Sequence, residues 1–261
     1  MKAPFAIFFL GSVMTAFGLT DKDLTHIGFD QNIGREVSRE LQFQTSEGQA
    51  TTLGQCLDGE KPVILVMGYS RCPMLCEFVN DGLIKALQDV RLTPGRDFKI
   101  LNVSVDPAEA PAAAARRKAE YVRQYGRATA AEAWQFLVGK EPAIRELANE
   151  VGFHYAYDAG SGEYAHPSGI VVLTPQGVVS RYLLGVNYDP AELLQAIRGA
   201  GREERGSIVH ELALLCFHYN PVTGKYSLAI LKVVRLAGLL TLAAIAIAVV
   251  YLSRRRGALS T

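Results

Sequence analysis

The sequence has no excess of charge of either sign. Lysine and arginine together number 27 against 26 acidic residues, which leaves a formal net charge of +1 across 261 residues. Proteins that bind nucleic acid usually carry a basic excess or a basic patch, so this composition gives no electrostatic reason to expect a nucleic-acid partner. Internal repeats and long low-complexity tracts are absent too. The length suits one ordinary domain with additional segments at its ends.

Cysteine is scarce as well. Four cysteines are too few to staple a domain of this size with disulfides. Two of them, Cys72 and Cys76, stand between an apolar run at 63–67 and a helix-compatible stretch at 77–90. The junction between a strand end and a helix start is where α/β folds place their chemistry. We therefore interpret this pair as chemical rather than architectural.

The longest apolar runs lie near the two ends of the chain. At the N-terminal end, residues 3–20 carry no charge after Lys2. This pattern predicts a secretory signal peptide or an uncleaved N-terminal anchor within residues 1–20. Either segment would direct the rest of the chain out of the cytoplasm, where thiols tend to be oxidised unless another protein maintains them. A thiol reductase that keeps Cys72 and Cys76 reduced is therefore an expected partner.

The C-terminal apolar run covers residues 236–252 and is followed by three arginines at 254–256. Its length is near the lower limit of about 17 residues for a membrane span, and positive residues typically mark the cytoplasmic end of such a span. We predict a transmembrane helix over 232–253, a juxtamembrane segment over 201–231 and a cytoplasmic tail over 254–261. The globular part would then lie on the extracytoplasmic (periplasmic) side of the cell membrane, held by this single helix.

The central part of the chain alternates between strand and helix patterns. Runs of apolar and β-branched residues predict buried strands, and apolar residues at helical spacing predict helices. The predicted strands are 62–67, 98–105, 134–138, 168–173 and 178–184, and the predicted helices are 72–90, 108–125, 142–151 and 190–198. A hairpin is expected within 41–53, and Phe78 is expected on the apolar face of its helix. This order predicts an α/β fold, a thioredoxin-like domain over residues 21–200.

The two cysteines would point to one place if both lie on the helix predicted at 72–90. Residues four apart share a helical face, and Pro73 suits the first helical position. Unpaired N–H groups at a helix start also favour thiolate over thiol. Two interpretations follow, a redox dithiol or a pair of metal ligands. The spacing favours the metal, because three intervening residues leave room for an ion to bridge the two sulfurs.

Two thiolates alone leave a metal ion under-coordinated, so a third ligand is expected. His166 is the candidate because it directly precedes the strand predicted at 168–173. In a thioredoxin-like sheet, that loop faces the start of the cysteine helix. Two thiolates and one imidazole suit copper, above all Cu(I), better than calcium or magnesium, whereas zinc usually takes a fourth ligand.

Four motifs follow one another along the chain. They are Cys72-Pro73-x-x-Cys76 after an apolar strand, Val103-Ser104-Val105-Asp106-Pro107 at the end of the next strand, Phe136-Leu137-Val138-Gly139, and His166 before Ile170-Val171-Val172-Leu173. Together they resemble the SCO/SenC family, and the resemblance extends over residues 28–198. The C-terminal part, with Leu215-Cys216-Phe217-His218 before the apolar run, resembles a bacterial branch of that family with a C-terminal membrane helix.

The resemblance implies a membrane-tethered copper protein that helps to assemble the dinuclear copper centre of cytochrome c oxidase subunit II. The family's copper ligands carry over to Cys72, Cys76 and His166, which would hold Cu(I), Cu(II) or both. Two neighbouring positions depart from the usual pattern: Glu77 stands where many members have proline, and Ala165 where many have aspartate. Both departures change groups around the ligands, which tune metal affinity and potential. The expected protein is a metallochaperone rather than a classical enzyme.

Two other functions remain open at this point. An extracytoplasmic thiol–disulfide oxidoreductase would use Cys72 and Cys76 without metal to reduce cysteines of an oxidase subunit. A thioredoxin-like peroxidase is a weaker match, because Tyr69 stands where a Thr-x-x-Cys pattern would place threonine.

The other candidate residues have simpler interpretations. Cys56 is expected to be a small buried apolar residue. A disulfide between Cys56 and Cys216, or a second metal site formed by Cys216 with His210 and His218, are the alternatives. Asp106 and the proline after it are expected to form a strand-ending turn.

Overall fold

The computed structural model describes residues 27–72 and 75–203, together with short pieces at 219–220, 225–226, 238–239 and 241. The predicted leader or anchor at 1–20 and the predicted tail at 254–261 lie outside the described residues. The predicted juxtamembrane segment and transmembrane helix lie mostly outside them. Among the residues that are described, no helix has both the length and the apolar composition needed to cross a membrane.

The chain divides into two compact units, residues 1–205 and 206–261. In the second unit, β12 (Tyr219–Asn220) pairs antiparallel with β13 (Lys225–Tyr226). All the features that follow belong to the first unit.

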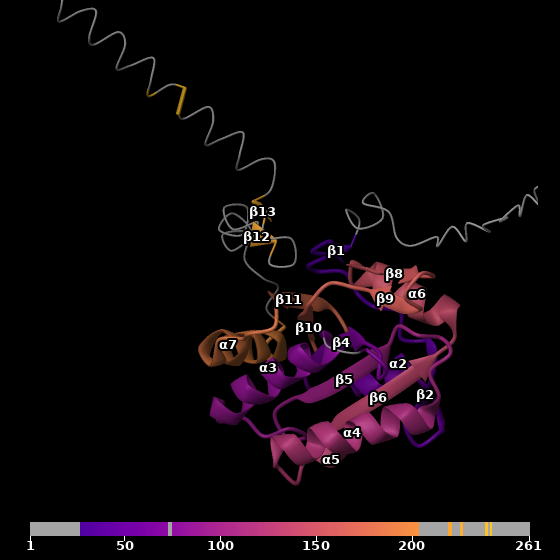
Figure 1. Ribbon diagram of the computed structural model, residues 1–261. Helices are drawn as coiled ribbons and strands as arrows, with labels where there is room; N and C mark the ends of the chain where they lie inside the picture. The colour runs from indigo at the N-terminus through magenta and orange to yellow at the C-terminus, as the bar shows by residue number, and fades with distance from the viewer. Residues whose placement is uncertain are drawn as a thin grey trace, which may run out of the picture. The chain divides into compact units, whose positions relative to one another are not determined.

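A seven-stranded mixed sheet forms the centre of the first unit (Figure 1). Its strand order is β11-β10-β4-β5-β6-β2-β3, with β4, β5 and β6 parallel and the outer strands antiparallel. The strands are β2 (Gln42–Thr45), β3 (Ala50–Thr52), β4 (Val63–Gly68), β5 (Lys99–Ser104), β6 (Trp134–Gly139), β10 (Gly169–Leu173) and β11 (Val179–Leu184). The predicted α/β class, the central strands and the hairpin at 41–53 are therefore confirmed.

Helices cover both faces of this sheet. The helices are α2 (Leu53–Leu57), α3 (Leu75–Asp89), α4 (Pro111–Tyr125), α5 (Ala130–Ala133), α6 (Glu141–Glu150) and α7 (Pro190–Gly201). Apolar residues of α3, α4 and α7 form one buried cluster with one face of the sheet, while α2 and α6 contribute to the cluster on the other face. All six residues of β4 are buried, as expected for a strand covered on both sides.

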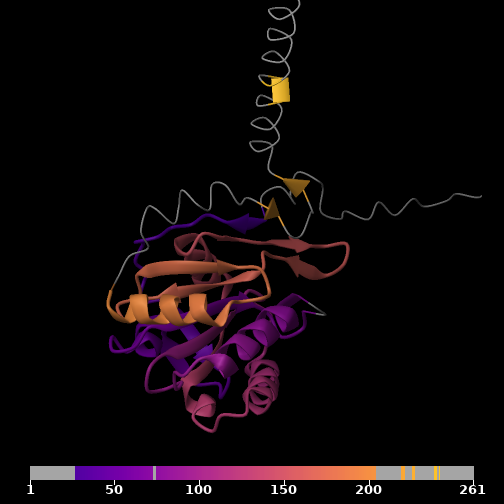
Figure 2. The ribbon, with the colours of Figure 1, turned by 90° about the vertical axis from the view of Figure 1, so that its left-hand side faces the viewer.

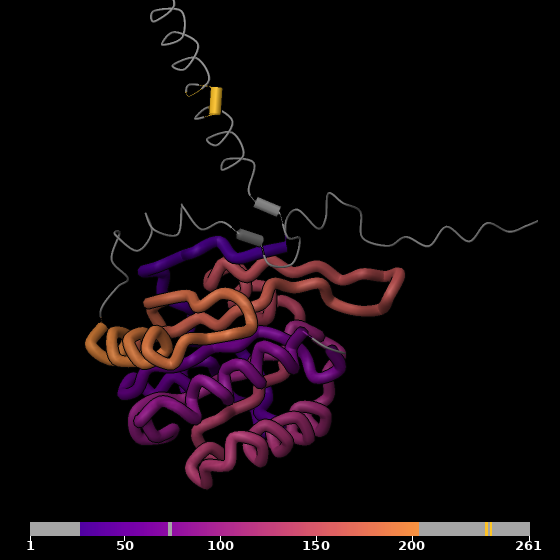
Figure 3. The backbone as a smooth tube through the Cα atoms, turned by 60° about the vertical axis from the view of Figure 1, so that its left-hand side comes forward, coloured from indigo at the N-terminus to yellow at the C-terminus, as the bar shows by residue number. Residues whose placement is uncertain are grey.

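Four short strands lie outside the seven-stranded sheet, at the end where residues 69–72 leave β4. They are β1 (Gly28–Phe29), β7 (Phe153–His154), β8 (Ala156–Asp158) and β9 (Glu163–Ala165), and they pair as β1 with β7 and β8 with β9. The sequence patterns did not predict them, because segments of two or three residues show no periodicity. In Figures 2 and 3, the β8–β9 hairpin projects at the same end of the unit as the start of α3.

Two predictions about the cysteine helix are corrected by the structure. Helix α3 begins at Leu75, so Cys72 precedes it and the two cysteines do not share a helical face. Phe78 is 50% exposed rather than buried, because the inward face of α3 is formed by residues such as Val79 and Leu83. Pro73 lies outside the described residues.

Helix α4 also begins later than predicted. Residues 106–109 form a turn closed by a hydrogen bond from the Glu109 N–H to the Asp106 carbonyl (3.0 Å), so the helix begins only after this turn. Pro111 then occupies the first turn, where its missing N–H costs no hydrogen bond. The expected strand-ending turn at Asp106 is confirmed by the hydrogen bond from the Ala108 N–H to its carboxylate (2.9 Å).

Candidate metal centre

The cysteine segment leaves the sheet where two parallel strands end side by side. Gly68 closes β4 opposite Ser104 of β5, and the chain turns through Tyr69 and Cys72 into α3. Glycine is needed at position 68 because a Cβ atom there would lie 2.9 Å from the Cys76 sulfur. The carboxyl ends of parallel strands are the usual location of ligand sites in open α/β sheets.

Three predicted ligands meet at this point. The sulfurs of Cys72 and Cys76 and one ring nitrogen of His166 all lie within 4.8 Å of one another. The His166 Nε2 atom is 3.1 Å from the Cys76 sulfur and 3.9 Å from the Cys72 sulfur. All three residues are buried, and no second group of this kind occurs in the part of the chain that the structure describes.

The two sulfurs are coupled to each other and to the start of α3. The Cys76 N–H points at the Cys72 sulfur (3.3 Å), and the Tyr69 N–H points at the Cys76 sulfur (3.4 Å). Such donors favour thiolates. The hydrogen bond with the Cys72 sulfur, burial and the charge of Cys72 nevertheless raise the pKa of the Cys76 thiol. Two neighbouring thiolates therefore need a positive charge between them, which a metal ion provides.

His166 is held with one nitrogen directed at the sulfurs. Its Nδ1 atom lies 3.0 Å from the Pro167 carbonyl, which places the ring proton on Nδ1 and leaves the lone pair of Nε2 for a ligand bond. The ring stacks on Phe153 at a centroid distance of 5.9 Å and meets Tyr69 edge to face at 6.1 Å. These contacts fix the ring orientation. The donor set of two sulfurs and one imidazole fits a soft metal ion.

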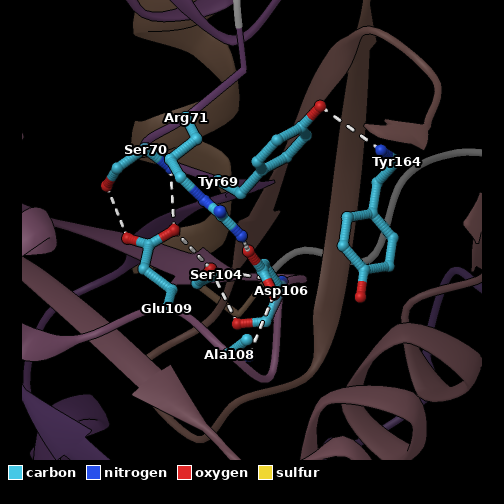
Figure 4. Close-up of polar contacts among 8 residues, drawn as sticks. All are labelled: Tyr69, Ser70, Arg71, Ser104, Asp106, Ala108, Glu109 and Tyr164. Carbon is cyan, nitrogen blue, oxygen red and sulfur yellow. Dashed lines mark hydrogen bonds and ion pairs between the residues drawn. The ribbon is translucent and has the colours of Figure 1, made fainter. Parts of the chain in front are cut away.

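A polar network supports the segment before Cys72 (Figure 4). The buried Glu109 carboxylate accepts hydrogen bonds from the Ser70 N–H (2.8 Å), the Ser70 hydroxyl (2.5 Å) and the Ser104 hydroxyl (2.8 Å). Arg71 pairs with the buried Asp106 at 2.5 Å. Sequence reasoning missed Glu109 and Ser70, which are 39 positions apart and belong to no recognised motif.

The remaining candidates do not join the site. Cys56 is buried beside the Thr51 hydroxyl (3.8 Å), as expected of a small apolar core residue. His154, a histidine outside the candidate set, pairs with Asp30 at 2.8 Å. Cys216 lies outside the described residues, and so do the two alternatives considered for it, a second metal site and a disulfide with Cys56.

A family model described as SCO1/SenC matches residues 30–201. No curated protein matches the chain.

Solved structures also resemble this chain. An Aquifex aeolicus protein is 26% identical with a TM-score of 0.57, covering 66% of this chain and 95% of its own. Arabidopsis thaliana ScoI with copper bound is 20% identical with a TM-score of 0.50, covering 66% and 99%. A SCO1/SenC family lipoprotein from Bacillus anthracis is 17% identical with a TM-score of 0.52, covering 65% and 95%. The shared fold is thioredoxin-like. Because the family model spans well over half of the sequence, the chain belongs to the SCO1/SenC family.

Proposed function

We propose that the protein is a copper metallochaperone that helps to assemble the dinuclear copper site of cytochrome c oxidase subunit II. The observation that carries this proposal is the convergence of Cys72, Cys76 and His166 within 4.8 Å on a buried site. Membership of the SCO1/SenC family and the likeness to a copper-bound ScoI structure support copper as the metal.

The ligand set suits delivery as well as binding. Two thiolates and one imidazole match the preference of Cu(I) for soft ligands, and three ligands leave a position that a group of the acceptor can enter. Copper would then pass to subunit II by ligand exchange, with each new bond to the acceptor replacing one bond to this chain. Copper binds the deprotonated thiols, so binding releases the thiol protons. A Cys72–Cys76 disulfide has no thiolate to offer, so only the dithiol form of the site would hold copper.

The proposed location is the extracytoplasmic side of the cell membrane. The apolar run at 236–252 and the arginines at 254–256 support a single-pass tether at the C-terminal end. Protease treatment of intact spheroplasts tests this arrangement. Digestion of the globular domain with protection of a C-terminal tag is the expected result, and protection of the whole chain would contradict it.

An anaerobic Cu(I) competition titration of the full-length protein tests the function. We expect one Cu(I) per reduced chain, with much weaker binding by the His166→Ala variant. His154→Ala is the matched control, because His154 pairs with Asp30 away from the sulfurs. Equal affinity of His166→Ala and wild type would show that the third ligand is wrongly assigned.

A second candidate function is thiol–disulfide exchange, favoured by one specific contact. The Cys76 N–H at the start of α3 points at the Cys72 sulfur, which favours the Cys72 thiolate, and the two cysteines are not joined in a disulfide. In this reaction the dithiol becomes a disulfide while a target disulfide gains two electrons and two protons, and a thiol reductase then regenerates the pair. A His166→Ala variant that reduces oxidised subunit II as fast as wild type, yet transfers no copper, would favour this alternative.

A further inference from the structure

Glu109 is a buried acidic residue that is not one of the three proposed ligands. It is 8% exposed and lies in the turn between β5 and α4. Both of its carboxylate oxygens are directed at Ser70, one toward the hydroxyl and the other toward the backbone N–H. The oxygen that accepts the N–H also accepts the Ser104 hydroxyl at the end of β5. A buried carboxylate with three donors is fixed in orientation, and it fixes its partners in turn.

The backbone of Ser70 is held from both sides. Its N–H donates to Glu109, and its carbonyl accepts a hydrogen bond from the Arg117 guanidinium (3.0 Å) of α4. Ser70 stands only two residues before Cys72. The position of the Cys72 sulfur therefore depends on where Ser70 is anchored.

The sheet itself does little to place this turn. The β4–β5 ladder ends at Gly68, and a last backbone hydrogen bond runs from the Val105 N–H to the Gly68 carbonyl (2.7 Å). Beyond Gly68, the Cys72 N–H bonds back to the Tyr69 carbonyl (3.3 Å), which closes the turn without tying it to a neighbouring strand. Side-chain contacts then position the turn. The β5–α4 region holds it at Ser70 and Arg71, and the Tyr164 N–H of β9 donates to the Tyr69 hydroxyl (3.3 Å).

We propose that Glu109 is a positioning residue for the metal ligand Cys72. It anchors Ser70 so that the Cys72 sulfur faces His166 and Cys76 before any metal arrives. This inference rests on the proposed copper-binding function and extends it to a residue outside the ligand set. Residues that orient metal ligands typically change metal affinity by roughly 10–100-fold when they are removed.

The same molecule contains a matched control. Glu150, at the end of α6, is 7% exposed and accepts hydrogen bonds from both the N–H (2.9 Å) and the hydroxyl of Ser38. The chemistry repeats that of Glu109 with Ser70. Ser38 precedes β2, and among the described residues no hydrogen bond links Ser38 or Glu150 to residues 69–72. Loss of Glu150 therefore reports the structural cost of losing such a contact without disturbing Cys72.

The experiment compares Glu109→Ala, Glu109→Gln and Glu150→Ala in the full-length protein. Cu(I) affinity is measured by anaerobic competition, and the Cys72–Cys76 dithiol–disulfide equilibrium is measured against glutathione without metal. We expect Glu109→Ala to weaken Cu(I) binding by roughly 10–100-fold and to move the metal-free dithiol–disulfide equilibrium away from its wild-type value, because the Cys72 sulfur is no longer held facing Cys76. Glu109→Gln, which keeps an oxygen for the Ser70 N–H, should show a smaller effect. Glu150→Ala should match wild type in both measurements.

The two readouts separate this inference from the proposed function. If wild type binds no Cu(I), the proposed function fails, and the dithiol equilibrium alone then decides whether Glu109 positions Cys72. If Glu109→Ala matches wild type in both readouts, or if Glu150→Ala changes them equally, the positioning role is overturned. A circular-dichroism melting curve for each variant confirms that the measurements are made on folded protein.

Discussion

Glu109 with Ser70 and Glu150 with Ser38 show one interaction in two regions of the molecule. In each pair a buried carboxylate binds both the backbone N–H and the hydroxyl of a serine. The first pair holds a turn that carries the proposed metal ligand Cys72, and the second holds the chain that enters the outer strand β2. The role of such a contact therefore depends on which residue follows the serine, and not on the contact itself.

The two pairs also differ in whether their donors have a second hydrogen-bond acceptor nearby. The Ser38 hydroxyl has a second acceptor, Glu146, at 3.4 Å. Glu109 binds three donors: the N–H and the hydroxyl of Ser70 and the hydroxyl of Ser104. Among the described residues, only the Ser104 hydroxyl has another acceptor, the Asp106 carbonyl at 3.5 Å. Losing Glu109 should therefore leave more donors poorly paired.

The largest expected effect is on stability. Glu109→Ala should lower the free energy of unfolding by about 3 kcal/mol and Glu150→Ala by about 2 kcal/mol, because buried donors left unpaired cost roughly 1–3 kcal/mol each. Urea denaturation of the reduced, metal-free protein, followed by circular dichroism, measures both values. A larger loss of unfolding free energy for Glu150→Ala would show that Glu146 does not replace Glu150 as the acceptor of the Ser38 hydroxyl.

The ion pair next to the cysteine turn should contribute less than the carboxylate–serine pair. Arg71 is 69% exposed, although its partner Asp106 is buried. Solvent screens such a pair, so Arg71→Ala should cost about 1 kcal/mol or less and should weaken Cu(I) binding less than Glu109→Ala. The same titration and denaturation assays test this ranking. Equal losses of affinity would mean that the ion pair and the Glu109 contact position Cys72 to the same extent.

Independence of the two regions gives a smaller but sharper prediction. In the Glu109→Ala/Glu150→Ala double variant, the losses of unfolding free energy should add to within about 0.5 kcal/mol, because the two carboxylates share no partner. Its Cu(I) affinity should equal that of Glu109→Ala alone. A double-mutant cycle on the unfolding free energy and on the Cu(I) affinity tests this. A coupling energy clearly above about 0.5 kcal/mol would show that the two regions are energetically coupled.

An exposed version of the same contact should matter least. Glu47 accepts a hydrogen bond from the Ser46 hydroxyl (2.8 Å) but is 55% exposed. Slight burial opposes its ionisation, yet hydrogen bonds from Ser46, Lys118 and Thr45 lower the pKa of Glu47 to about 2. Its contribution is thus present above the ordinary value of 4.5 and is lost as pH falls toward 2.

Solvent keeps that contribution small. Glu47→Gln should therefore change the free energy of unfolding at pH 7 by less than about 1 kcal/mol, and the difference from wild type should shrink as pH falls from 5 to 2. Urea denaturation across this range measures the difference. A difference that grows in acid would contradict the assigned direction of the pKa shift.

The sequence patterns predicted the framework of the site well. The apolar run at 63–67 became β4, and the alternation of strands and helices placed Cys72, Cys76 and His166 at one edge of the sheet. The helix boundary was wrong by three residues at Cys72, because periodicity shows that a helix is present but not where the preceding turn ends. The exposure of Phe78 was missed for a related reason, since an apolar residue near a helix start can lie on either side of the buried stripe.

Local patterns and residue chemistry were enough to predict the α/β class, the order of the elements and three candidate ligands. The side chains that surround those candidate ligands could be identified only from the folded structure. Glu109 meets Ser70 because the parallel pairing of β4 and β5 brings Gly68 opposite Ser104 and so aligns the two following turns. A contact between residues 39 positions apart depends on strand register, and no local pattern in the chain encodes it.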